Sequence, residues 1–250
     1  MESVPCRDNR LLRALQRHCP ALRRVGTLLA VPAGVELGRD EDVVLFPLSG
    51  LLSLRLARSM PRADEGTGAD KGMGGRRRSC PVDVDLVAND GMAGIGAWLG
   101  VGPTLENIVA LTPAAVLRMP ARTFVDRVTR HRGGRRLMDR LVAYRLRCSY
   151  QNVVCAAHHS VEQRTCRWLL WTADRAGDAP IALTQAGLAR LLGVRRQSVG
   201  ETALALQQAA SIRYTRQRIV VADRKVLLDR SCACYHTLCE TFRQIVEPLL

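Results

Sequence analysis

Four consecutive residues, Arg195, Arg196, Gln197 and Ser198, are the side chains of this sequence best suited to recognising another molecule. Arginine pairs with guanine, glutamine pairs with adenine, and serine pairs with several bases. Glu201 follows one helical turn later and can accept a hydrogen bond from cytosine. This run therefore predicts direct reading of base edges in double-stranded DNA.

Two short helices joined by a tight turn are needed to position that run. Thr184 can cap the first helix, Gly193 supplies the left-handed residue that ends it, and Val194 fills the turn. Apolar residues recur at helical spacing in both helices, with a small residue where the helices approach each other: Leu188, Ala189, Leu191, Leu192, Val199, Ala203 and Leu206. This order of features predicts a helix-turn-helix.

The segment Ile212–Val221 alternates like a β-hairpin, which predicts a wing beside the second helix. Between Leu183 and Arg230 the sequence holds nine basic residues and three acidic ones, a balance that favours binding to a polyanion. We expect phosphate contacts from five residues of these elements, namely Thr184, Gln185, Arg213, Arg216 and Arg218.

A long helix is expected before this domain. Its apolar series steps by four and three residues, as in a two-stranded coiled coil, and consists of Leu137, Leu141, Tyr144, Cys148, Gln151 and Cys155. We expect this seam to form a homodimer. A helix packed on its own domain produces the same spacing, so that alternative stays open.

The first half of the chain has short apolar runs separated by glycine and proline, which is typical of an all-β unit. We expect a β domain over residues 1–120, with a flexible insertion over 60–81 that is rich in glycine and charge. A helical connector and the dimerisation helix should cover 121–159, broken at Gly133-Gly134. Residues 160–250 should form the DNA-binding domain.

Composition limits the function classes. The net charge of +14 favours a polyanion or a membrane surface as a partner, and 47% hydrophobic residues suffice for an ordinary core. Neither a signal peptide nor a membrane span is predicted, so we expect a cytoplasmic protein with no membrane partner. Motifs for phosphate cradling or nucleophilic catalysis are absent, which argues against an enzyme.

The nine cysteines contain no C-x-x-C pair, and we predict neither a cofactor nor a bound metal. An alternative function is a metal- or thiol-redox-sensing regulator. It would use one of two groups: either Cys155, His158, His159, Glu162 and Cys166, or Cys232, Cys234 and Cys239. On a helix Cys232 and Cys234 point apart, so we expect them to pack the C-terminal helix instead.

The sequence resembles the Crp/Fnr family of bacterial transcription regulators. HSVEQRTCRWLLW (His159–Trp171) and LTQAGLARLLGVRRQSV carry the resemblance most strongly, and FPLSGLLSL (Phe46–Leu54) and GMAGIGAWLG (Gly91–Gly100) extend it to the first half. The resemblance implies an α+β fold, with an N-terminal jelly-roll (β-roll) domain like those that bind cyclic nucleotides, a long dimerisation helix and a C-terminal winged helix-turn-helix. It also implies homodimers that act on palindromic promoter sites with RNA polymerase as a partner.

The sequence departs from this pattern at several points. The stretch Gly94–Val109, where relatives hold a cyclic nucleotide, contains no arginine, and its one acid, Glu106, lies late. Cyclic AMP and cyclic GMP are therefore not the expected effectors, and the effector is unknown. Gln197 and Glu201 differ from well-studied members, so the operator should differ. Ala210 and Gln217 replace usual glycines and predict a less tightly turned wing.

Overall fold

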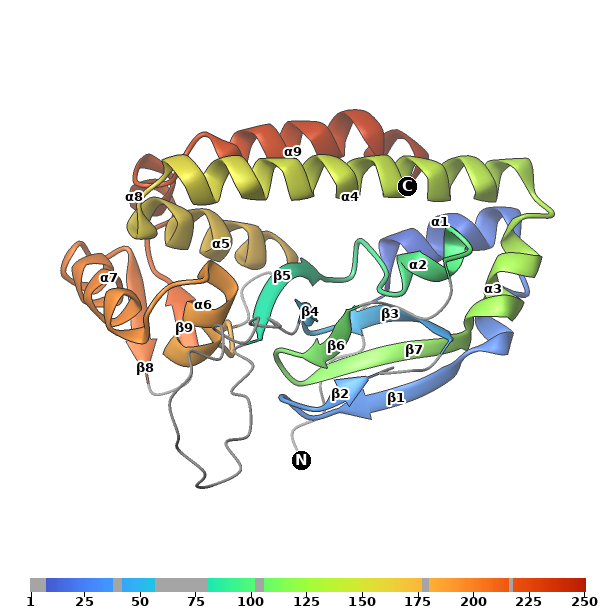
Figure 1. Ribbon diagram of the computed structural model, residues 1–250, viewed down its shortest axis with the longest axis horizontal. Helices are drawn as coiled ribbons and strands as arrows, with labels where there is room; N and C mark the ends of the chain where they lie inside the picture. Colours follow the sequence, from blue (N-terminus) through green and yellow to red (C-terminus); the bar gives the residue numbers. More distant parts are fainter. Residues whose placement is uncertain (1–7, 38–41, 57–80, 102–105, 177–179, 216–217) are drawn as a thin grey trace, which may run out of the picture.

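The computed structural model describes residues 8–37, 42–56, 81–101, 106–176, 180–215 and 218–250. Two antiparallel sheets lie under a layer of helices, and a smaller, mainly helical unit lies at one end of the molecule (Figure 1). Most of the predicted insertion over residues 60–81 falls outside the described residues.

Two sheets build the N-terminal unit, and every strand pairing within them is antiparallel. One has the order β1-β7-β3, and the other has the order β2-β6-β4-β5. The strands are β1 (Thr27–Val31), β2 (Glu36–Leu37), β3 (Val43–Ser49), β4 (Leu52–Leu56), β5 (Val82–Val87), β6 (Asn107–Ala110) and β7 (Ala114–Pro120).

Strand β3 is apolar at successive positions because both of its faces are buried. Val43 and Leu45 lie in the core that contains residues of both sheets. Val44 and Phe46 lie on the other face, in a second core shared with the helices. The three-stranded sheet therefore supports the helical layer as well as closing the β unit.

Helices cover this sheet and continue into the long connector. They are α1 (Arg10–His18), the short 3-10 turn Leu22–Val25, α2 (Ile95–Trp98), α3 (Ala121–Val128), α4 (Arg132–His158) and α5 (Val161–Ala176). A capping box starts α5, because Ser160 and Gln163 exchange hydrogen bonds of 3.0 and 3.2 Å. In the described part of the chain, none of the helices has the length and apolar content to cross a membrane.

The first helix is attached to the β unit through a buried polar residue. Asn9 is fully buried, and its side chain caps α1 by accepting a hydrogen bond from the Leu12 N–H at 2.8 Å. Its amide donates to the carbonyls of Pro47 and Gly91, each at 2.9 Å. Because every one of these groups is paired, the buried amide fixes α1 against strand β3 and the loop at Gly91.

The break predicted at Gly133-Gly134 is wrong in its position. Helix α3 ends at Val128, and both glycines lie in the first turn of α4. Neither glycine has a positive φ, so the backbone conformation does not require glycine at these positions. Instead, close neighbours leave little room for a side chain. A Cβ on Gly133 would approach the His18 ring to 2.3 Å, and one on Gly134 would approach a Val128 methyl to 3.1 Å.

The seam predicted for dimerisation is buried inside the chain. Leu137 and Leu141 are each 1% exposed, and Tyr144 stacks edge-on against Phe242 with ring centroids 5.3 Å apart. Cys148 and Cys155 are buried too, and Gln151 is half-buried. These side chains are therefore not available to a second chain, and the alternative of a helix packed on its own domain describes this face.

The partner of that face is the C-terminal helix, which runs alongside α4 (Figure 1). The remaining elements are α6 (Gln185–Leu192), α7 (Arg196–Gln208), β8 (Ile212–Thr215), β9 (Arg218–Val221), α8 (Arg224–Asp229), α9 (Cys234–Ile245) and the 3-10 turn Glu247–Leu249. Leu238 and Val246 join the core that holds α4, α1 and α3.

Helix α7 ends in a Schellman motif with alanine at the left-handed position. Ala210 has φ +54°, and its N–H donates to the Gln207 carbonyl at 2.9 Å. The N–H of Ser211 reaches the Leu206 carbonyl at 3.0 Å. The tight turn is thus kept without glycine, and the expected loosening of the wing is not found at this position.

This geometry makes Ala210→Gly a stabilising change. A left-handed non-glycine residue costs about 1–2 kcal/mol, part of which glycine loses again through its larger unfolded-state entropy. We expect the free energy of unfolding to rise by about 0.5–1 kcal/mol, measured by urea denaturation. Ala209→Gly is the control, because Ala209 has φ −78° and needs no glycine; it should lower stability instead.

Candidate nucleic-acid interface

Helices α6 and α7 meet at a sharp turn that the sequence specifies residue by residue. The Thr184 hydroxyl caps α6 by accepting from the Gly187 N–H at 3.0 Å. Gly193 ends the helix with φ +64°, and the Val194 N–H returns to the Ala189 carbonyl at 3.0 Å. The predicted cap, turn glycine and helix order are therefore present, which is the geometry of a helix-turn-helix.

The inner faces of the two helices are buried as predicted. The buried residues are Leu188, Ala189, Leu191, Leu192, Val199, Ala203 and Leu206. All of them except Ala203 belong to one core with Trp168 and Leu169 of α5. The guanidinium of Arg164 on α5 also donates to the Leu192 carbonyl at the end of α6. Helix α5 is consequently the platform that holds the pair in place.

The predicted base-reading residues lie together at the start of α7. Arg195, Arg196, Gln197 and Glu201 are exposed and Ser198 is half-buried. Arg195 is the N-cap, just outside the helix. The Gln197 amide donates to a Glu201 carboxylate oxygen at 3.1 Å, so these two side chains are coupled one turn apart on the exposed face.

A two-stranded sheet flanks the helix pair, as predicted for a wing. Strands β8 and β9 pair from Ile212 with Val221 to Thr215 with Arg218. Ile219 also exchanges two backbone hydrogen bonds with Ile181, which attaches the wing to the segment before α6. Arg213 and Arg218 are exposed at its edge. The predicted phosphate contact Arg216, and Gln217 beside it, lie outside the described residues.

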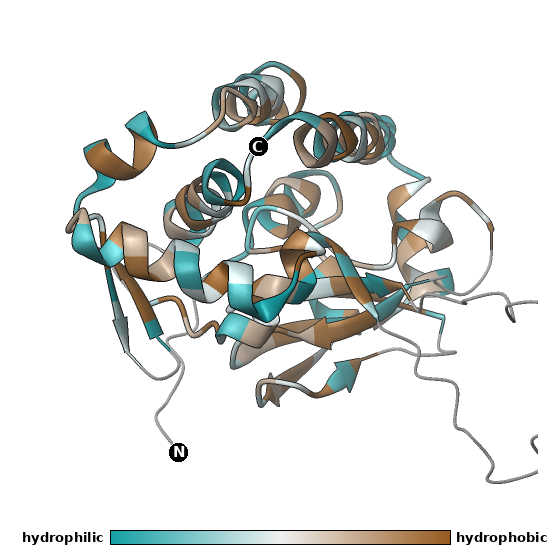
Figure 2. Cartoon of the chain, turned by 60° about the vertical axis from the view of Figure 1, so that its left-hand side comes forward, coloured by the Kyte–Doolittle hydropathy of each residue, from teal (hydrophilic) through white to brown (hydrophobic). Residues whose placement is uncertain are grey.

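The other side of α6 contacts the β unit. Thr184 and Arg218 line a cleft of about 390 Å³ together with Gly34 and Arg55 of the β unit. Gln185 is half-buried beside Gly200. Figure 2 views the molecule with the helix-turn-helix side towards the reader, and hydrophilic and hydrophobic residues alternate along its helices. The base-reading residues are thus open to solvent, whereas two predicted phosphate contacts lie beside the β unit.

Three acidic residues of the β unit meet arginines of the helices. Asp85 lies 3.0 Å from Arg145 of α4, and Asp90 lies 2.6 Å from Arg175 of α5. Asp83, whose side chain is fully buried, lies 2.7 Å from Arg55 and 3.8 Å from Arg190 of α6. These pairs were not predicted from the sequence. They could have been expected from Asp83 and Asp85, which are two residues apart on a strand and therefore share one face of it in a strongly basic chain.

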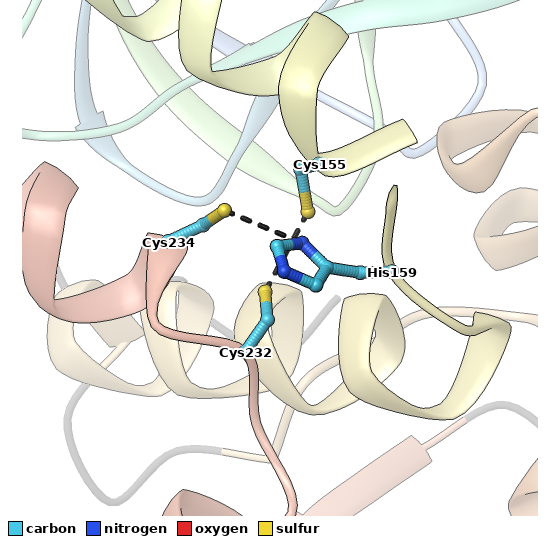
Figure 3. Close-up of side chains that lie close together, drawn as sticks. All are labelled: Cys155, His159, Cys232 and Cys234. Carbon is cyan, nitrogen blue, oxygen red and sulfur yellow. Dashed lines mark hydrogen bonds between the residues drawn. The ribbon is translucent and has the colours of Figure 1, made fainter. Parts of the chain in front are cut away.

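The cysteine and histidine residues group differently from either predicted set. Cys155 and His159 of the first group lie beside Cys232 and Cys234 of the second (Figure 3). Cys232 precedes α9 and Cys234 is its first residue, so the expectation that the two point apart on a helix is wrong.

The other members of those groups lie elsewhere. Cys166 is fully buried in the core of the helix-turn-helix unit, and burial raises the pKa of its thiol to about 12. Glu162 accepts a hydrogen bond of 2.9 Å from Arg230. His158 is exposed, and Cys239 packs beside the core that holds Cys166. Cys166 is therefore an unreactive packing residue.

Comparison with known proteins identifies the helical unit. Residues 163–230 match the family model of the Crp-like helix-turn-helix domain. No curated protein sequence matches the chain at a significant level.

Several solved structures are similar in fold over most of the chain. FixK2 from Bradyrhizobium japonicum is 15% identical with a TM-score of 0.66, over 84% of this chain and 98% of its own. TTHB099, a CRP-family transcriptional regulator from Thermus thermophilus, is 14% identical with a TM-score of 0.61, over 81% and 96%. TTHA1359, a CRP/FNR-family transcriptional regulator from the same organism, is 17% identical with a TM-score of 0.58, over 82% and 98%.

Proposed function

We propose that this chain is a transcription regulator of the Crp/Fnr type, which binds palindromic promoter DNA as a homodimer and reads bases with the start of α7. The observation that carries the proposal is the exposed run Arg195–Gln197 at the first turn of the second helix of a helix-turn-helix. Such a helix end enters the major groove with its first side chains at the base edges. RNA polymerase is the further partner that we propose, and the cytoplasm is the compartment.

Electrostatics supports this assignment. The chain has a net charge of +14, and its helix-turn-helix region has an excess of basic over acidic residues. Arg213 is exposed on strand β8 of the wing, from which an arginine can contact a phosphate backbone. Binding of DNA to such a surface releases counterions from the phosphates. The affinity for DNA should therefore fall steeply as the salt concentration rises.

The homodimer needs a surface other than the buried seam, and α4 has one. Its exposed side carries apolar residues at spacings of three and four: Ala143, Leu146, Tyr150, Val153 and Ala157. Leu146 is 50% exposed, Tyr150 59% and Val153 69%. At about 100° per residue this series lies opposite the buried Leu137–Cys155 series. This spacing suits packing against the same helix of a second chain, because a symmetric two-helix coiled coil buries the apolar stripes of both chains at once.

Dimerisation is tested by charging this stripe. We expect Leu146→Glu with Tyr150→Glu to yield folded monomers, because two carboxylates would be buried at the seam. Sedimentation velocity measures the mass, and circular dichroism verifies the fold. Arg147→Glu, beside the stripe, is the control and should remain dimeric. A charged-stripe variant that still sediments as a dimer would place the interface elsewhere.

Base reading is tested by selecting binding sites from random DNA. Arg196→Ala should flatten the preference for guanine at one symmetric position, since a bidentate contact is worth roughly 1–3 kcal/mol of discrimination. Arg213→Ala is the matched control: it should weaken all sequences alike and reduce the salt slope by about one unit. An unchanged consensus of equal sharpness with Arg196→Ala would rule out base reading by this residue.

We further propose that the signal is not a cyclic nucleotide. No arginine occurs in Gly94–Val109 to neutralise a cyclic phosphate, and the half-buried Glu106 is already engaged in an interaction. Titration calorimetry with cyclic AMP and cyclic GMP should give no saturable heat, and DNA affinity should be the same with and without either compound. Saturable binding at micromolar concentration would contradict this.

A further inference from the structure

Three thiols and one imidazole converge at the junction between the long helix and the C-terminal helix (Figure 3). Cys155 lies on the last turn of α4 and His159 is its C-cap. Cys232 lies between α8 and α9, and Cys234 begins α9. One ligand atom from each residue lies within 4.8 Å of every other. The group thus gathers side chains from two segments that are 77 residues apart.

The distances within the group match the edges of a coordination tetrahedron. The Sγ atoms of Cys155 and Cys232 are 3.6 Å apart, and Cys234 Sγ lies 3.5 Å from His159 Nδ1. Metal–ligand bonds of about 2.3 Å to sulfur and 2.0–2.1 Å to nitrogen give edges of roughly 3.8 and 3.6 Å in a tetrahedron. We propose that Cys155, His159, Cys232 and Cys234 bind one zinc ion.

The chemistry of the set selects zinc among common metals. Three soft thiolates with one imidazole form a typical Cys₃His structural set, whereas magnesium and calcium prefer oxygen ligands. Four protein ligands leave no open position for water or substrate. The site is therefore structural and does not catalyse a reaction.

The surroundings distinguish this group from cysteines that merely fill a core. Cys155, Cys232 and Cys234 are 1%, 3% and 2% exposed, yet they form a cluster of their own apart from the large apolar cores. The Gln151 amide donates to Cys234 Sγ at 2.9 Å, as an outer hydrogen bond to a metal-bound thiolate does. Packing alone does not explain a polar amide directed at a buried sulfur.

A buried arginine offsets the negative charge of the proposed zinc site. Zinc with three thiolates and a neutral imidazole has a net charge of −1. The guanidinium of Arg167 is buried, and its positive charge acts on Cys155. Its Nε has no hydrogen-bond partner among the described residues. A buried anionic site beside this buried cation makes both less costly to bury.

The zinc would join the end of α4 to the segment between α8 and α9. Helix α4 gives way to α5 at His159 and Ser160, where the chain leaves the connector for the helix-turn-helix. Cys155 and His159 precede Ser160 in the chain, and Cys232 and Cys234 follow it. Zinc therefore cross-links the connector to the end of the DNA-binding unit, and this role is independent of which DNA sequence is read.

The metal content of the full chain, purified under reducing conditions from zinc-supplemented cells, is the primary test. We expect about one zinc per chain by elemental analysis. His159→Ala and Cys232→Ser should lose the zinc on dialysis against a chelator. Their matched controls are His158→Ala and Cys239→Ser, which change the neighbouring histidine and a cysteine outside the cluster. Both controls should keep the zinc.

Cobalt substitution tests the ligand set in the wild-type chain, so the result does not depend on variants that fail to fold. Chelator-treated, reduced protein should bind one Co²⁺, with thiolate-to-cobalt charge-transfer and tetrahedral d–d absorption, and zinc should displace it. Only trace zinc together with no cobalt absorption would overturn the proposal. So would zinc that His159→Ala and Cys232→Ser leave unchanged, or a Cys155–Cys232 disulfide found by mass spectrometry in place of the metal.

Discussion

The burial of one face of helix α4 is the constraint on which the rest of the structure depends. Leu137 and Leu141 pack with α1, α3 and the sheet, and Tyr144 packs against Phe242 of α9. Each such side chain contributes roughly 1.5–3 kcal/mol when fully buried. Because α4 runs along most of the length of the molecule (Figure 1), it holds the β unit at one end and leads into the helix-turn-helix unit at the other.

The second determinant of the arrangement is the set of aspartate–arginine pairs on β5 and the turn that follows it. Asp83, Asp85 and Asp90 each face an arginine of a different helix, and the Asp83 side chain is fully buried. Buried ion pairs add little net stability, but losing one partner leaves an uncompensated charge. Of these pairs, Asp83–Arg190 joins the β unit directly to the helix-turn-helix, whereas the other two join it to α4 and α5. Arg190 also lines the cleft beside Thr184, so a motion that opens this cleft would separate Asp83 from Arg190.

The sequence could predict the features that depend on local chemistry. Caps at Thr184 and Ser160 and the left-handed Gly193 follow from their neighbours, so the helix-turn-helix was predictable to within a residue. The partner of the α4 seam was not, because a four-three spacing is equally suited to α9 of the same chain and to a second chain. The exposed stripe was also obscured, since Leu146 lies between Arg145 and Arg147 and the residues around it looked solvated.

The cysteine group escaped sequence analysis for a different reason, and that reason bears on how the molecule is held together. Spacing rules find ligands that lie in one short motif, whereas this group forms only when the chain after α8 returns to the end of α4. Only His159 and Ser160 separate α4 from α5, so the backbone alone leaves the angle between the helices open. Arg230 reaches back to Glu162, and Cys232 and Cys234 reach back to Cys155 and His159. The segment 230–234 therefore sets the direction in which the helix-turn-helix leaves the connector.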